Sequence, residues 1–183
     1  MGSDKALLEF DGESLLARTL RKAQAVAGRV CIVGSREKFE LFGPVIEDEY
    51  VERGPLAGIH AALQATTTEL NLVLAVDLPF LPEAALRYIV EQARACDAVV
   101  TVPRIGGFRQ TLCAVYRLEF AELAEQALRA GRNKIDPLYE QTSVRVLDEA
   151  ELAEVDIEPA MFDNLNTPQD LERAVRARPA RTA

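Results

Sequence analysis

The stretch from Leu72 to Pro79 restricts the possible folds of this chain more than any other part of the sequence. Five apolar residues, Leu72 to Val76, are followed at once by Asp77, and Pro79 stands two residues further on. A short run of leucine, valine and alanine bounded by turn residues is typical of a strand buried on both faces, as in a parallel sheet. Open α/β sheets bind ligands beyond the carboxyl ends of such strands, so Asp77 is placed where a metal ion or ligand would bind. A second interpretation, that Asp77 only caps a turn, stays open at this point.

The spacing of apolar residues switches between helical and strand-like periods along the whole chain. Strands that alternate with helices, without internal repeats or linkers, predict one doubly wound α/β domain over residues 1–183, with a frayed tail at 177–183. We predict helices at 14–27, 37–42, 55–66, 82–95 and 119–130 and from 167 onward, and strands at 29–34, 45–48, 70–76, 97–103, 110–116 and 143–147.

The overall charge and the cysteines narrow the classes of function. A net charge of −8 argues against a nucleic-acid partner or an anionic membrane surface, and no apolar stretch is long enough to span a bilayer. Cys31, Cys96 and Cys113 are widely spaced and form no C-x-x-C pattern, which favours a reducing, cytoplasmic location. His60 is the only histidine, so we expect it to be a packed or surface residue of a helix and not part of a catalytic triad.

Three further features could contribute to a binding site. Lys5 stands near the start of the chain, where its charge would suit a phosphate, although such lysines are commonly solvated. Gly54 and Gly58 flank the start of a predicted helix, where glycine permits close approach of a ligand, although this motif alone favours an ordinary turn with helix packing. Asn164 and Asn166 are two residues apart, so in an extended segment both amides point to one side, although asparagine in loops is more often a local turn former.

Four motifs, taken in this order, resemble the molybdenum cofactor guanylyltransferase family, and the resemblance covers nearly the whole chain. It implies a three-layer, mostly parallel Rossmann-like sheet of the nucleotidyltransferase type. The family transfers GMP from GTP to the terminal phosphate of molybdopterin with release of pyrophosphate. The resemblance therefore implies GTP and Mo-molybdopterin as substrates, Mg²⁺ as the cofactor, and molybdoenzymes or their chaperones as candidate partners. The motifs are Met1-Gly2-Ser3-Asp4-Lys5-Ala6-Leu7-Leu8, Gly54-Pro55-Leu56-Ala57-Gly58-Ile59, Val76-Asp77-Leu78-Pro79 and Asn164-Leu165-Asn166-Thr167-Pro168.

The resemblance also implies roles for residues at matching positions. Asp77 would bind magnesium and Lys5 would contact a nucleotide phosphate, and both would be catalytic. Asp48 matches a position that contacts the guanine nucleotide. Gly54 and Gly58 would let the backbone pass close to the substrates.

On the pterin side, the resemblance implies a role in activity for Asn164 and Asn166.

Two alternative enzyme activities stay open, a cytidylyltransferase for the same cofactor and a sugar-phosphate nucleotidylyltransferase, because all these enzymes can share the fold and the metal chemistry. A non-catalytic carrier of a pterin or a partner protein is a third alternative.

The chain departs from the family at its amino end. The family has a buried strand and a loop of the form L-A-G-G-x-S-x-R before the methionine that corresponds to Met1, and here the sequence starts within that signature. We therefore expect either that translation begins upstream of Met1 or that the chain is a fragment. Backbone N–H groups of such a loop bind phosphates, and the strand lies within the sheet. The first strand of the sheet is thus expected to be missing, leaving an open position, and GTP binding by the 183-residue form is expected to be weak.

Overall fold

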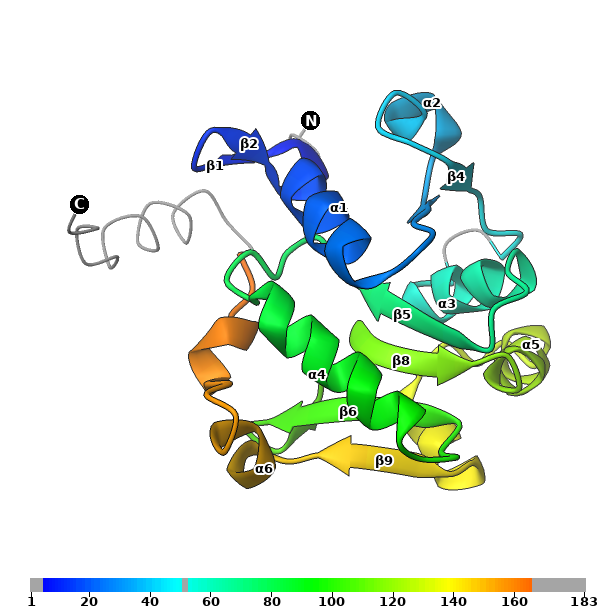
Figure 1. Cartoon of the computed structure of the whole chain (residues 1–183). Helices are drawn as coiled ribbons and strands as arrows, with labels where there is room; N and C mark the ends of the chain where they lie inside the picture. The colour runs from blue at the N-terminus through cyan, green and yellow to red at the C-terminus, as the bar shows by residue number, and fades with distance from the viewer. Residues whose placement is uncertain (1–4, 51–52, 166–183) are drawn as a thin grey trace.

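A five-stranded sheet lies at the centre of the computed structural model, which describes residues 5–50 and 53–165 (Figure 1). β8 pairs with β5 on one side and with β6 on the other, and β9 pairs with β6. The strand β7 forms a hairpin with the end of β6. The strands are β5 (Leu70–Leu74), β6 (Val100–Ile105), β7 (Phe108–Arg109), β8 (Cys113–Arg117) and β9 (Val144–Leu147).

The direction of β8 makes this sheet mixed. β5, β6 and β9 run the same way, whereas β8 lies antiparallel between β5 and β6. The cause is local: only a short connection through β7 joins β6 to β8, and a parallel return would require a crossover of about a dozen residues or more. The expected α/β class is confirmed, with this antiparallel strand inserted into the mostly parallel pattern.

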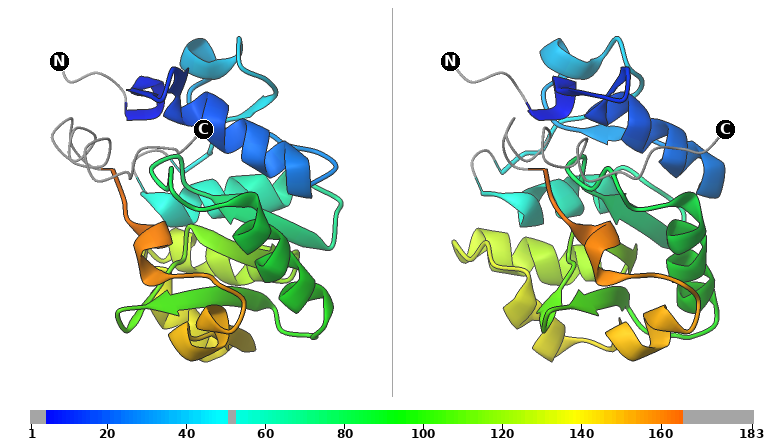
Figure 2. Two further views of the ribbon diagram at one scale, coloured as in Figure 1. Left: turned by 60° about the vertical axis from the view of Figure 1, so that its left-hand side comes forward. Right: turned by 90° about the vertical axis from the view of Figure 1, so that its left-hand side faces the viewer.

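Helices cover both faces of the sheet (Figures 1 and 2). On one face lies α4 (Glu83–Arg94), with α1 (Leu15–Val26) packed beside it, and on the other lie α3 (Pro55–Gln64) and α5 (Phe120–Arg129), which pack against each other. Residues of β8 alternate between the two cores: Ala114 and Tyr116 face α3 and α5, and Cys113 and Val115 face the α4 side. This alternation is what a strand buried on both faces requires.

The first part of the chain lies at one end of the sheet, beyond β5 (Figure 2). Its elements are η1 (Lys5–Leu7), the hairpin of β1 (Glu9–Phe10) and β2 (Glu13–Ser14), β3 (Ile32–Val33), α2 (Arg36–Phe39) and β4 (Val45–Ile46). β3 and β4 form a parallel two-stranded sheet of their own. Among the residues described, neither strand is hydrogen-bonded to β5, and the edge of β5 away from β8 has no ladder partner. The open position expected in the sheet stays a prediction, because residues 1–4 and 166–183 lie outside the described part of the chain.

Several boundaries differ from those predicted, for identifiable reasons. The strand expected at 29–34 is assigned only at Ile32–Val33, because its ladder bonds come from β4 alone. Gly106 and Gly107 have φ of 57° and 81°, the values of a type I′ turn, so the strand expected to end at 103 continues to 105 and returns as β7. The sequence did not predict α6 (Glu149–Ala153), η2 (Asp136–Gln141) or η3 (Pro159–Phe162), and the last predicted helix lies outside the described residues. Across 5–50 and 53–165, no helix combines the length and the apolar character needed to cross a membrane.

Candidate functional site

Asp77 follows β5 by three residues, at the carboxyl end of that strand, as expected. Its side chain is half-buried. The backbone N–H of Leu165 donates to the carbonyl oxygen of Asp77 at 3.0 Å. This hydrogen bond joins two positions far apart in the sequence, and it places Asn164, which is exposed, in the segment directly beside Asp77. Asn166 lies outside the described residues.

A small apolar cluster explains why these segments meet. Phe10, Leu15 and Leu165 are buried together, and Leu8 and Phe80 pack against them. The rings of Phe10 and Phe80 meet edge to face, with centroids 5.7 Å apart. The cluster therefore ties three parts of the chain to one place: the segment after Lys5, the loop after Asp77 and the segment that begins with Asn164.

A second cluster lies between the end of β5 and the two-stranded sheet. Ala6, the neighbour of Lys5, and Val76, the neighbour of Asp77, both belong to it. The backbone positions of Lys5 and Asp77 thus border the same patch of core, and the Lys5 side chain is exposed. The buried members of this cluster are Ala6, Leu16, Ile32 and Val45, and Leu20, Phe39 and Val76 pack against them.

The other predicted nucleotide residues lie around β4 and the start of α3. Asp48 is half-buried and follows β4 by two residues. Gly54 is the residue before α3, with φ of 68° and ψ of −162°, a conformation that residues with a side chain rarely adopt. Gly58 lies inside α3, and a Cβ built there would be 3.5 Å from Cγ1 of Val33 in β3. The vacant side-chain position of Gly58 thus faces β3.

A buried lysine, which the sequence interpretation did not single out, holds the loop after Asp77. Lys22 of α1 is 8% exposed, and its Nζ donates to the carbonyl oxygen of Pro79 at 2.7 Å. Burial lowers the pKa of Lys22 to about 8, with a further contribution from the charges of Arg18 and Arg21. One sequence signal was available: position 22 lies on the same face of the helix as the buried Leu15 and Thr19.

The acidic residues of the site fit one kind of metal binding. In the described ranges, no three histidine, cysteine, aspartate or glutamate side chains form a group that could hold a metal ion. Magnesium keeps several water ligands and is commonly bound by one or two carboxylates together with substrate phosphates. A single carboxylate at Asp77 is compatible with that mode of binding. His60 is buried against the ring of Tyr50, with centroids 5.5 Å apart, so of the two expected alternatives it is the packed one.

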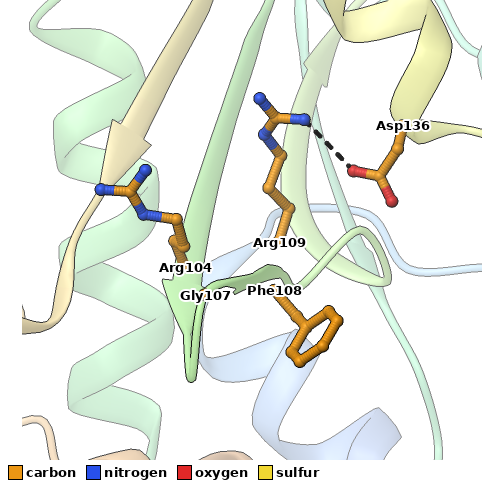
Figure 3. Close-up of a pocket in the computed structure, with 5 residues that line it drawn as sticks. All are labelled: Arg104, Gly107, Phe108, Arg109 and Asp136. Carbon is orange, nitrogen blue, oxygen red and sulfur yellow. Dashed lines mark hydrogen bonds and ion pairs between the residues drawn. The ribbon is translucent and has the colours of Figure 1, made fainter.

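The structure also contains a pocket that the sequence interpretation missed, between the β6–β7 hairpin and η2 (Figure 3). Its volume is about 280 Å³. The sequence carried a signal for it, because a two-residue glycine turn places residues 104 and 109 opposite each other. The residues that line the pocket are Arg104, Gly107, Phe108, Arg109 and Asp136.

Comparison with known proteins yields matches along most of the chain. The family model described as MobA-like NTP transferase domain matches residues 1–146. A probable molybdenum cofactor guanylyltransferase of Pelotomaculum thermopropionicum is 39% identical over 186 residues, covering 100% of this chain and 89% of the relative. The crystal structure of molybdopterin-guanine dinucleotide biosynthesis protein A from Archaeoglobus fulgidus matches with a TM-score of 0.81 at 27% identity, covering 94% of this chain and 89% of that one.

A more distant structure shares the fold alone. The 2-C-methyl-D-erythritol 4-phosphate cytidylyltransferase of Thermus thermophilus matches with a TM-score of 0.70 at 20% identity, covering 94% of each chain. Together, the family model, the 39% identical relative and the Archaeoglobus fulgidus structure define a nucleotidyltransferase, as expected. The chain belongs to the family of MobA-like NTP transferase domains, and its resemblance to molybdenum cofactor guanylyltransferases is confirmed. Nucleotidyltransferases of this kind generally depend on a divalent metal.

Proposed function

We propose that this chain transfers GMP from GTP to the phosphate of Mo-molybdopterin, with release of pyrophosphate, in the biosynthesis of molybdopterin guanine dinucleotide. Family membership and a 39% identical relative named as a guanylyltransferase support this activity. The structural observation that carries the proposal is the hydrogen bond from Leu165 to Asp77, because it joins the proposed metal side of the site to the proposed pterin side.

The proposed reaction is a displacement at phosphorus. An oxygen of the pterin phosphate attacks the α-phosphorus of GTP, the bond from that phosphorus to the oxygen bridging the β-phosphate breaks, and pyrophosphate leaves with the electron pair. The nucleophile is already anionic, so the main obstacle is the repulsion between two anions. Asp77 would hold Mg²⁺, which supplies positive charge at the phosphates when bound, and Lys5 would contact a nucleotide phosphate.

The remaining site residues would divide between the two substrates. Asp48, Gly54 and Gly58 would line the nucleotide side, since they lie at the end of β4 and the start of α3. Asn164 and Asn166 would act on the pterin side. The cytoplasmic location and the delivery of product to molybdoenzymes or their chaperones remain part of this proposal.

A comparison of nucleotide donors tests the activity. The longest natural chain that contains these 183 residues is incubated with Mg²⁺, Mo-molybdopterin and GTP, CTP or UTP in turn, and pyrophosphate and the dinucleotide product are measured. We expect product chiefly from GTP. Equal or greater product from CTP would favour the cytidylyltransferase alternative, and bound pterin without pyrophosphate release would favour the carrier.

The expected weakness of GTP binding is tested separately. GTP and Mg²⁺ are titrated into the 183-residue form and into a form extended upstream of Met1. Tighter binding by the extended form is the expected result, because the backbone N–H groups of a glycine-rich loop would bind the phosphates. Equally tight binding by both forms would contradict it.

A further inference from the structure

The β6–β7 hairpin holds two arginines side by side. Arg104 and Arg109 are directly opposite each other in the antiparallel register, and Gly106 and Gly107 form the turn between them. Side chains at directly opposite positions of an antiparallel pair lie on the same face, with Cβ atoms about 5 Å apart, and like charges there repel. An arrangement of this kind is stabilised when an anion binds between the two guanidinium groups.

The surroundings of the pair neutralise it only in part. Nη1 of Arg109 is 3.4 Å from a carboxylate oxygen of Asp136, whose side chain is 63% exposed, and the same guanidinium lies over the ring of Tyr139 at 5.5 Å. Within the described parts of the chain, the guanidinium of Arg104 has no hydrogen-bond or ion-pair partner. The phenyl ring of Phe108 points away from Arg109 (Figure 3). The residues that line the pocket thus carry one net positive charge, in a chain whose net charge is −8. A further carboxylate, that of Glu149, lies at the turn of the hairpin, where it accepts from the backbone N–H of Gly106 at 2.7 Å.

The pair lies at the same edge of the sheet as Asp77. β5 and β6 run in the same direction on either side of β8, so their carboxyl ends meet at one edge. Arg104 is the second-last residue of β6, and Asp77 lies three residues beyond β5. Positions two strands apart in a sheet are separated by about 10 Å between their backbones, a distance that the long arginine side chains and the phosphate they would bind can close.

We propose that Arg104 and Arg109 bind the phosphate monoester of the acceptor, on the opposite side of the reaction centre from the nucleotide. This assignment rests on the proposed guanylyl transfer. Arginine suits the role because its planar guanidinium group binds phosphate oxygens in pairs. A pocket of about 280 Å³ holds a phosphate group and its neighbouring atoms, and is too small for a complete dinucleotide. Asp136 competes with the phosphate for Arg109.

The binding experiment uses phenyl phosphate as the probe, titrated into the 183-residue chain by calorimetry and followed by NMR. Arg104→Gln and Arg109→Gln are each expected to weaken binding about tenfold, because each removes a charge-assisted contact. Asp136→Asn is expected to strengthen it, since it removes the competing carboxylate. Arg94→Gln is the matched control, because this substitution removes the same charge. Arg94 is exposed and lies at the end of α4, at the opposite edge of the sheet.

Three results would overturn the assignment: no binding by the unsubstituted chain, equal weakening by Arg94→Gln, or unchanged binding in the Arg104 and Arg109 variants. In the transfer assay, the same two variants should raise the KM for the pterin at least about tenfold and leave the KM for GTP unchanged. Transfer with an unchanged pterin KM would refute the arginine site alone. Failure of the unsubstituted natural chain to transfer GMP would refute the proposed function, while the phenyl phosphate titration would still decide whether the arginines bind phosphate.

Discussion

Raising the pH from 7 to 10 should stabilise this chain relative to a Lys22→Met variant. Lys22 is 8% exposed, and its burial lowers the pKa from 10.5 in a model compound to about 8. Between these two values the unfolded chain binds the proton and the folded chain has lost it, so the free energy of unfolding rises with pH. At about 1.4 kcal/mol per pH unit, the cost of burying the charge is about 3 kcal/mol. This cost is present in full below about pH 7 and is relieved as the pH rises through the folded pKa of about 8 toward 10.5.

Other groups titrate in the opposite sense, so a variant is needed to isolate the lysine. Burial raises the pKa of Cys113 to about 12 and raises the pKa values of Tyr116 and Tyr139. In the unfolded chain these groups ionise at lower pH, so they make the free energy of unfolding fall as the pH rises through that range. Subtracting the curve of Lys22→Met removes their contribution, because methionine keeps most of the side-chain volume and does not titrate.

Urea unfolding of both proteins, followed by circular dichroism at pH 7, 8, 9 and 10, measures this difference. From pH 7 to pH 10, the free energy of unfolding of the unsubstituted chain should rise by about 2 to 3 kcal/mol relative to that of the variant. The variant also loses the hydrogen bond to Pro79, but this loss shifts the difference by the same amount at every pH. A difference that is constant from pH 7 to 10, or that falls, would refute the assignment of Lys22 as a buried, titrating group.

Three further predictions concern stability. Gly54→Ala should lower the free energy of unfolding by about 1 to 3 kcal/mol, because Gly54 has a φ of 68°. Gly58→Ala should leave this free energy unchanged or raise it, since the added Cβ lies in a helix and makes only an ordinary van der Waals contact. Equal losses for the two variants in urea unfolding would contradict this prediction. Ser14→Ala should cost about 1 kcal/mol through loss of the bond that Ser14 accepts from the first turn of α1, and an unchanged urea midpoint would contradict it. Tyr139→Phe should cost about 1 kcal/mol, less than Tyr116→Phe, because Tyr116 also donates to a backbone carbonyl; the reverse order would contradict the hydrogen-bond pattern.

The sequence predicted the elements whose signal is local. β5 was expected at 70–76 and is found at Leu70–Leu74, with Asp77 just beyond it, because the apolar run that starts at Leu72 and is bounded by turn residues is typical of a buried strand. The helix cap at Ser14 was likewise predictable, and its Oγ accepts from the N–H of Ala17 at 3.1 Å.

What the sequence did not reveal depends on contacts between distant segments. The bond from Leu165 to Asp77 and the packing of Phe10 on Phe80 have no local signal, since each joins residues that are about 70 or more positions apart. The direction of β8 follows from the hairpin at Gly106 and Gly107. The sequence indicates a turn there, but β7 is too short to be recognised as a strand from the sequence. The buried Lys22 resembles a surface residue in the sequence, and only the position of the Pro79 carbonyl explains it.

The carboxylate of Asp77 is the group on which the proposed metal binding and transfer depend most. The direct measurement is the rate of GMP transfer by the longest natural chain and by its Asp77→Asn variant, at saturating GTP and Mg²⁺. Asp97→Asn is the control, because Asp97 is exposed at the opposite edge of the sheet. We expect a loss of about a hundredfold or more for Asp77→Asn, an unchanged urea midpoint for both variants, and full activity for Asp97→Asn. Transfer by Asp77→Asn at a rate close to that of the unsubstituted chain would contradict the account.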